Sequence, residues 1–97
     1  MFAILIDKRA FSDIQNTVDY YNSNAKGLGK KFEKSLEKEL LNISKNPFYQ
    51  VRYKNVRCKL IKKFPYLIHY TINSKLREVY VFAVLCTHKN IKQLKKK

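Results

Sequence analysis

The sequence predicts an α+β fold in which a helical hairpin packs against a mainly antiparallel β-sheet, in the order β-α-α-β-β-β. The chain of 97 residues has room for a single hydrophobic core, so we expect one domain over residues 1–97. Two segments repeat apolar residues every three or four positions, which is the period of an amphipathic helix. Later segments alternate apolar with polar residues or are continuously apolar, as β-strands are.

The first half of the chain predicts one strand and two antiparallel helices. Residues 2–6 form a short apolar run typical of a buried strand, and Asp7 can cap the helix that follows. Apolar stripes predict helices over about 8–23 and 28–45, and both glycines of the chain lie in the turn at 22–29. The stripes consist of Phe11, Ile14, Val18 and Tyr21 in the first helix and of Leu28, Phe32, Leu36, Leu40 and Ile43 in the second.

The second half predicts three strands after a loop near residues 48–54. Residues 56–60 alternate apolar and basic side chains, which is the pattern of a half-buried strand. Residues 66–72 continue the sheet after a short hairpin. Residues 78–86 are so continuously apolar that we expect a central strand covered on both faces. The basic tail at 89–97 is expected to be loose.

Positive charge is concentrated in the later part of the chain. The sequence holds 21 Lys and Arg against 7 Asp and Glu, a formal net charge of +14. Six of the acidic residues lie in residues 1–39, whereas from residue 40 onward Glu78 is the only acidic residue. We expect the cations of the later strands to gather on one side of the sheet and to attract a polyanion such as RNA, DNA or an acidic protein. Ordinary surface charge that serves solubility is the alternative.

Cysteine content and the N-terminal segment exclude several classes of protein. Cys58 and Cys86 are the two cysteines, and without paired-ligand spacing they indicate neither a disulfide framework nor a zinc site. We expect both to be packing residues and expect no cofactor. The apolar run that ends at Asp7 is too short for a signal peptide or a membrane span, so the expected location is the cytoplasm, with no membrane partner.

Several short motifs, taken in order, resemble the RelE/ParE toxin superfamily over nearly the whole chain. The residues that carry the resemblance in the two helices are Ala10, Asp13-Ile14, Tyr20-Tyr21, Gly27-Leu28-Gly29, Phe32 and Asn46-Pro47. Those that carry it in the strands are Val56-Arg57, Phe64-Pro65-Tyr66, Tyr70 and Val81-Phe82-Ala83-Val84.

The resemblance implies the toxin of a bacterial type II toxin–antitoxin system, held inactive by a small acidic antitoxin in a hetero-oligomer. One branch of the family resembles ribosome-dependent mRNA endonucleases, and another resembles inhibitors of DNA gyrase that need no catalytic triad. Leu67 stands where the endonuclease branch has a functional arginine, which favours gyrase or a related partner as the target.

Two alternatives to a gyrase inhibitor stay open. Gyrase-inhibitor-like members often show His, Arg, Pro and an aromatic residue after the last strand, where this chain has Cys86, Lys89, Ile91 and Leu94. The endonuclease therefore remains one alternative. A basic nucleic-acid-binding module without toxicity is the other.

The candidate site residues follow from the chemistry of RNA cleavage. Attack of a 2′-hydroxyl on phosphate needs a proton acceptor, a proton donor and cations, so His69 and His88 are the catalytic candidates. We expect His69 to share a surface with Arg57 and Lys59 if their strands pair as a hairpin. The alternative is a half-buried His69 with one structural hydrogen bond, and a plain loop role for His88. The candidate nucleic-acid-binding or target-binding residues are Arg57, Lys59, Lys62, Lys89 and Tyr53.

Overall fold

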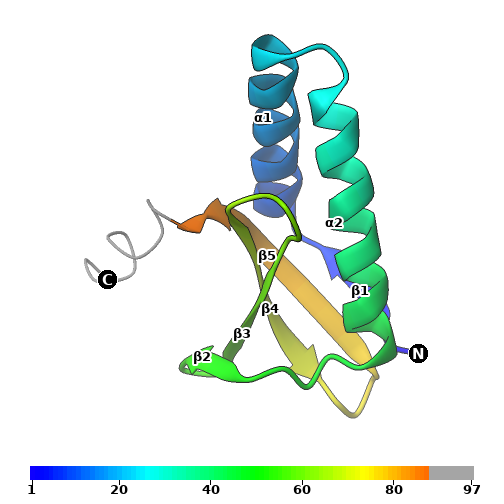
Figure 1. The fold of residues 1–97 in the computed structure, drawn as a ribbon. Helices are drawn as coiled ribbons and strands as arrows, with labels where there is room; N and C mark the ends of the chain where they lie inside the picture. The colour runs from blue at the N-terminus through cyan, green and yellow to red at the C-terminus, as the bar shows by residue number, and fades with distance from the viewer. Residues whose placement is uncertain (88–97) are drawn as a thin grey trace.

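A computed structural model describes residues 1–87 of the protein, and the basic tail at 89–97 lies outside the described residues. Two helices stand against one face of a five-stranded sheet, which confirms the predicted α+β fold (Figure 1). The elements are β1 (Ala3–Ile6), α1 (Lys8–Asn24), α2 (Leu28–Lys45), β2 (Val51–Tyr53), β3 (Val56–Leu60), β4 (Tyr66–Asn73) and β5 (Glu78–Cys86). Within residues 1–87, no helix has both the length and the apolar character needed to cross a membrane.

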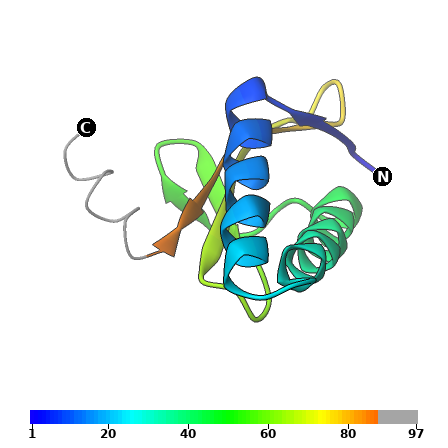
Figure 2. The same cartoon turned by 90° about the horizontal axis from the view of Figure 1, so that it is seen from above.

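The helical hairpin depends on an aspartate cap and on two glycines. The carboxylate of Asp7 accepts a hydrogen bond from the backbone N–H of Arg9 and so caps α1. Gly27 adopts the left-handed conformation, with a φ of 83°, between the helices. Gly29 allows close approach, because a Cβ there would lie 2.6 Å from the side-chain oxygen of Asn22. Viewed from above, the two helices lie side by side (Figure 2).

The sheet has the strand order β1-β5-β4-β3-β2. β1 is parallel to β5, and the three later pairs are antiparallel, as the mainly antiparallel prediction requires. β2 is an addition, because its residues fall in the segment 48–54 that was expected to be a loop. A strand of three residues is too short to show alternation, and Lys54, with a φ of 48°, makes its turn without a glycine.

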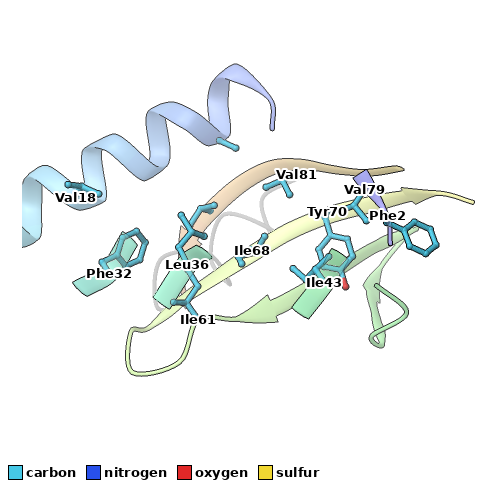
Figure 3. Packing of buried hydrophobic residues seen from close by; sticks show 12 residues of the cluster. Phe2, Val18, Phe32, Leu36, Ile43, Ile61, Ile68, Tyr70, Val79 and Val81 are labelled. Atoms are coloured by element: carbon cyan, nitrogen blue, oxygen red, sulfur yellow. The ribbon is translucent and has the colours of Figure 1, made fainter. Parts of the chain in front are cut away.

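The hydrophobic core lies between the helices and the face of the sheet that they cover, and we call the opposite face the far face (Figure 3). Phe32 and Ile43 of α2 and Tyr70 of β4 are fully buried there. A further aromatic cluster closes the end of the sheet at the β3–β4 turn, where Phe64 lies 5.1 Å from Tyr21 and 5.3 Å from Phe32 between ring centroids.

β5 is covered by helices on one face and not on both, so that expectation was wrong. Val79, Val81 and Val84 are buried on the helix side, whereas Tyr80 on the far face is 41% exposed. A bulge at Phe82, between the partners of His69 and Tyr70, breaks strict alternation. This irregularity, together with apolar residues on the far face, makes the sequence of β5 resemble that of a strand buried on both faces.

Candidate functional site: two faces of one hairpin

The β3–β4 register places the predicted site residues on opposite faces of the sheet. Cys58 pairs with His69, while Arg57 pairs with Tyr70 and Lys59 with Ile68. Tyr70 and Ile68 belong to the core, so Arg57 and Lys59 lie on the helix side and His69 lies on the far side. The expected surface shared by Arg57, Lys59 and His69 is therefore wrong, because a shift of one residue in register exchanges the faces and the sequence does not fix that register.

His69 is fully buried on the far face, more deeply than the half-buried alternative supposed. Its Nδ1 lies 3.1 Å from the hydroxyl of Tyr53 and 3.4 Å from Sγ of Cys58. Its ring also packs against Phe82, with centroids 6.2 Å apart. Burial, with a smaller effect of the nearby Arg52, lowers the pKa of His69 to about 4, so the imidazole is neutral at neutral pH.

Tyr53 and Cys58 can both donate a hydrogen bond to His69. Burial raises the pKa of the Cys58 thiol to about 11, and it also raises the pKa of Tyr53. Both groups therefore keep their protons and can donate them in hydrogen bonds. Nδ1 of the neutral imidazole can accept such a bond in the tautomer that carries the ring proton on Nε2.

Arg57 and Lys59 hold the segment 46–50 against the sheet. The Arg57 Nε donates to the carbonyl of Tyr49 over 2.7 Å, and its guanidinium lies 5.5 Å from the centre of the Phe48 ring. The Lys59 ammonium lies 3.3 Å from the carboxylate of Glu39 and 5.1 Å from the centre of the Tyr49 ring. Both cations thus make contacts within the chain.

Tyr70 holds the same segment by a hydrogen bond from the core. Its hydroxyl donates to the carbonyl of Pro47 over 2.7 Å, and burial raises its pKa to about 12, so the hydroxyl stays protonated. Arg57 lies next to Tyr70 across the strand pair. The position of Phe48 and Tyr49 is therefore set by three side chains of the β3–β4 hairpin and by α2.

The other predicted site residues do not join this group. Tyr53 is half-buried and hydrogen-bonded to His69, and Lys62 is exposed in the turn after β3. His88 and Lys89 lie outside the described residues. The charge of Arg52 lies close enough to lower the pKa of His69 on the far face, whereas Arg57 and Lys59 lie on the helix side. The cations of the later strands are therefore divided between the two faces of the sheet.

The prediction missed a row of aromatic rings and cations that extends from the β4–β5 turn to β3. The Arg77 guanidinium lies 4.5 Å from the centre of the Phe2 ring, and the rings of Phe2 and Phe48 are 5.7 Å apart edge to face. We call Arg77, Phe2, Phe48, Arg57, Tyr49 and Lys59 together the aromatic–cation row. Its members come from four separate segments, and the adjacent aromatics Phe48 and Tyr49 after the helix end are its one local signal.

No group of three or more His, Cys, Asp and Glu side chains that could hold a metal ion occurs within residues 1–87. Cys58 and Cys86 are both free thiols. They lie on β3 and β5, separated by β4, as expected for packing residues.

Solved structures of toxins share this fold. The chromosomal ParDE toxin–antitoxin system of P. aeruginosa matches with a TM-score of 0.76 and 11% identity, covering 89% of this chain and 96% of that one. The isolated E. coli RelE toxin matches with a TM-score of 0.68 and 15% identity, over 97% and 99% of the two chains. The E. coli RelBE toxin–antitoxin complex gives 0.66 and 17%, over 87% and 94%.

Sequence comparison identifies the family. No significant match was found among proteins of curated function. A family model for the ParE toxin of the type II toxin–antitoxin system parDE, however, matches residues 4–91. Together with the RelE/ParE-like fold, this match over most of the sequence shows that the chain belongs to the ParE toxin family of type II toxin–antitoxin systems.

Proposed function

We propose that this type II toxin acts by binding its target, DNA gyrase, and not by cutting RNA. The observation that carries the proposal is the position of His69. It is the one histidine among residues 1–87, it is fully buried, and its Nδ1 is occupied by Tyr53 and Cys58. A general acid or base must come within hydrogen-bond distance of the substrate, and a fully buried side chain does not.

The cations support the same proposal. In RNA cleavage, a proton-transfer group and a phosphate-binding cation act on one phosphate. Here Arg57 and Lys59 lie on the side of the sheet opposite His69, and Lys59 is already paired with the Glu39 carboxylate. An inhibitor that works by binding needs a complementary surface but no convergent catalytic groups.

The partner in the cell is a small acidic antitoxin. Two of the similar structures belong to toxin–antitoxin systems, ParDE and RelBE, and the formal charge of +14 on this chain favours an acidic partner. We place the pair in the cytoplasm, where gyrase works on DNA.

Two assays on the purified chain test the target. Supercoiling by DNA gyrase should be inhibited as the chain is added, and inhibition should be relieved by the antitoxin. Messages on translating ribosomes should stay intact when their ends are mapped. Codon-phased cuts with unimpaired supercoiling would instead establish the endonuclease. Activity in neither assay, with unimpeded growth of cells that express the chain alone, would favour the nucleic-acid-binding module.

A further inference from the structure

We propose that the aromatic–cation row is the docking surface for an extended acidic segment of the antitoxin, in which carboxylates flank a bulky apolar side chain. The inference rests on the proposed antitoxin partner and adds where and how that partner is held. The row begins at Arg77 and Phe2, where the β4–β5 turn, the N-terminus and the segment after α2 come together (Figure 1), and it extends to Lys59 on β3.

Two arginines in the row are held in place without an acidic partner. The ion pairs within residues 1–87 are Arg9 with Asp7 and Lys59 with Glu39, so neither Arg57 nor Arg77 has one in this part of the chain. Arg57 is fixed by its bond to the Tyr49 carbonyl and by the Phe48 ring, and Arg77 by the Phe2 ring. Because these contacts already restrict both side chains, an incoming carboxylate meets fixed donors and loses less side-chain entropy on binding.

An exposed ring lies between the two arginines. Phe48 is 55% exposed although its ring contacts both the Phe2 ring and the Arg57 guanidinium. Tyr49 and Val51 beside it are also more than a third exposed. A partner side chain that covers this apolar area gains hydrophobic stabilisation, while Arg57 and Arg77 pair with acidic residues on either side of it.

The arrangement favours a peptide over a nucleic acid. Bases bind single-stranded nucleic-acid sites by stacking on free ring faces. In the row, Arg77, Arg57 and Lys59 already lie over the rings of Phe2, Phe48 and Tyr49 respectively. Phe2 is also buried, so stacking there would displace contacts that carboxylates and an aliphatic side chain leave intact.

Affinity measurements with the full-length antitoxin, taken as the acidic product of the neighbouring gene, test this surface. The double variant Arg57→Gln/Arg77→Gln should bind the antitoxin about tenfold more weakly than the unmodified chain, and its affinity should depend less on salt. The matched control is Lys34→Gln/Lys38→Gln, which removes the same charge from exposed positions on α2. Its affinity should change by no more than about twofold.

Two single variants separate docking from folding. Arg77→Gln removes a guanidinium that lies over the Phe2 ring, and Phe48→Ser removes an exposed ring. Each should weaken binding with a circular dichroism spectrum unchanged from that of the unmodified chain. These variants keep the test valid if Arg57→Gln disturbs the segment 46–50.

The possible failures are distinguishable. If the antitoxin binds the unmodified chain and all row variants equally well, the docking surface is wrong and the proposed partner stands. If the unmodified chain binds no neighbouring gene product, the proposed antitoxin partner is wrong, and the docked segment proposed here is wrong with it, whereas the gyrase proposal is judged by the supercoiling assay. Tight binding of oligothymidylate that the row variants abolish, with antitoxin affinity unchanged, would identify the row as a nucleic-acid site instead.

Discussion

At the scale of single residues, His69 shows how an apparently catalytic side chain can be part of the core. Its neighbours Leu67 and Thr71 on the strand are half-buried, yet Tyr53 from β2 and Cys58 from β3 close over it. The sequence could not show this, because Tyr53 lies in a strand that local patterns did not predict. Direct measurement of the pH dependence of stability tests the buried, neutral state.

The first prediction is that acid lowers the stability of the folded chain through His69. The pKa of His69 is about 4 in the folded chain, against an ordinary value of 6.5. Below pH 6.5 the unfolded chain binds a proton that the folded chain does not, so the stability contribution is complete above this pH and falls as the pH approaches 4. The loss should reach about 3 kcal/mol, measured by urea unfolding across this range.

The variant His69→Gln supplies the comparison for that prediction. It should be less stable than the unmodified chain at neutral pH, because the hydrogen bonds and packing of the ring are lost, but it should lose less stability on acidification. Lys63→Gln, in the exposed β3–β4 turn, should keep the full acid dependence. Parallel pH profiles for the unmodified chain and His69→Gln would contradict a buried neutral imidazole.

At the scale of elements, the helices could be predicted from sequence and the edge of the sheet could not. Asp7, the two glycines and the apolar stripes act locally, so the helices begin and end within about one residue of the expected positions. The β3–β4 register and the strand β2 depend on contacts between segments. The expected surface shared by Arg57, Lys59 and His69 was wrong for this reason, since these residues lie on strands as expected but on different faces.

The second prediction tests the turn between the helices. A Cβ on Gly29 would lie 2.7 Å from the backbone oxygen of Val18, which a side-chain rotation cannot relieve. Gly29→Ala should therefore lower the free energy of unfolding by about 1–3 kcal/mol, measured by chemical denaturation. Gly27→Asn is the companion variant, because asparagine tolerates the left-handed conformation and nothing lies within 4 Å of that position. A loss for Gly27→Asn as large as that for Gly29→Ala would argue against close packing at Gly29.

The third prediction concerns the ion pair that joins α2 to β3. Glu39 is only 5% exposed, so Lys59→Met leaves a carboxylate with little water and without its cation. We expect a loss of about 2–3 kcal/mol in the free energy of unfolding. The double variant Lys59→Met/Glu39→Leu should recover most of this loss in a double-mutant cycle. Additive losses would mean that the pair does not couple the two elements.

At the scale of the whole molecule, the charge of +14 opposes the compact state by self-repulsion. The described ion pairs offset little of it, because Arg9 with Asp7 and Lys59 with Glu39 are the two within residues 1–87. An acidic partner would relieve the repulsion, which links binding of the antitoxin to the stability of the toxin.

The fourth prediction is that added salt stabilises the free chain. Raising sodium chloride from about 0.01 M to about 0.15 M shortens the Debye length from about 30 Å to about 8 Å and screens the repulsion. A gain of about 1 kcal/mol would raise Tm by about 4–8 °C, which calorimetry can measure. The variant Lys34→Gln/Lys38→Gln should show a smaller rise, because it carries less charge. A Tm that is flat or falls with salt would contradict this account.

The parallel pairing of β1 with β5 determines when the toxin can form during its synthesis. Ala3 is bonded in register with Glu78, so the first strand waits for its neighbour until almost the whole described chain has been made. While residues 78–86 are still inside the ribosome, the helices lack a large part of the surface on which they pack. Folding of the sheet, and of the helices that pack on it, can therefore be completed only after β5 has left the ribosome.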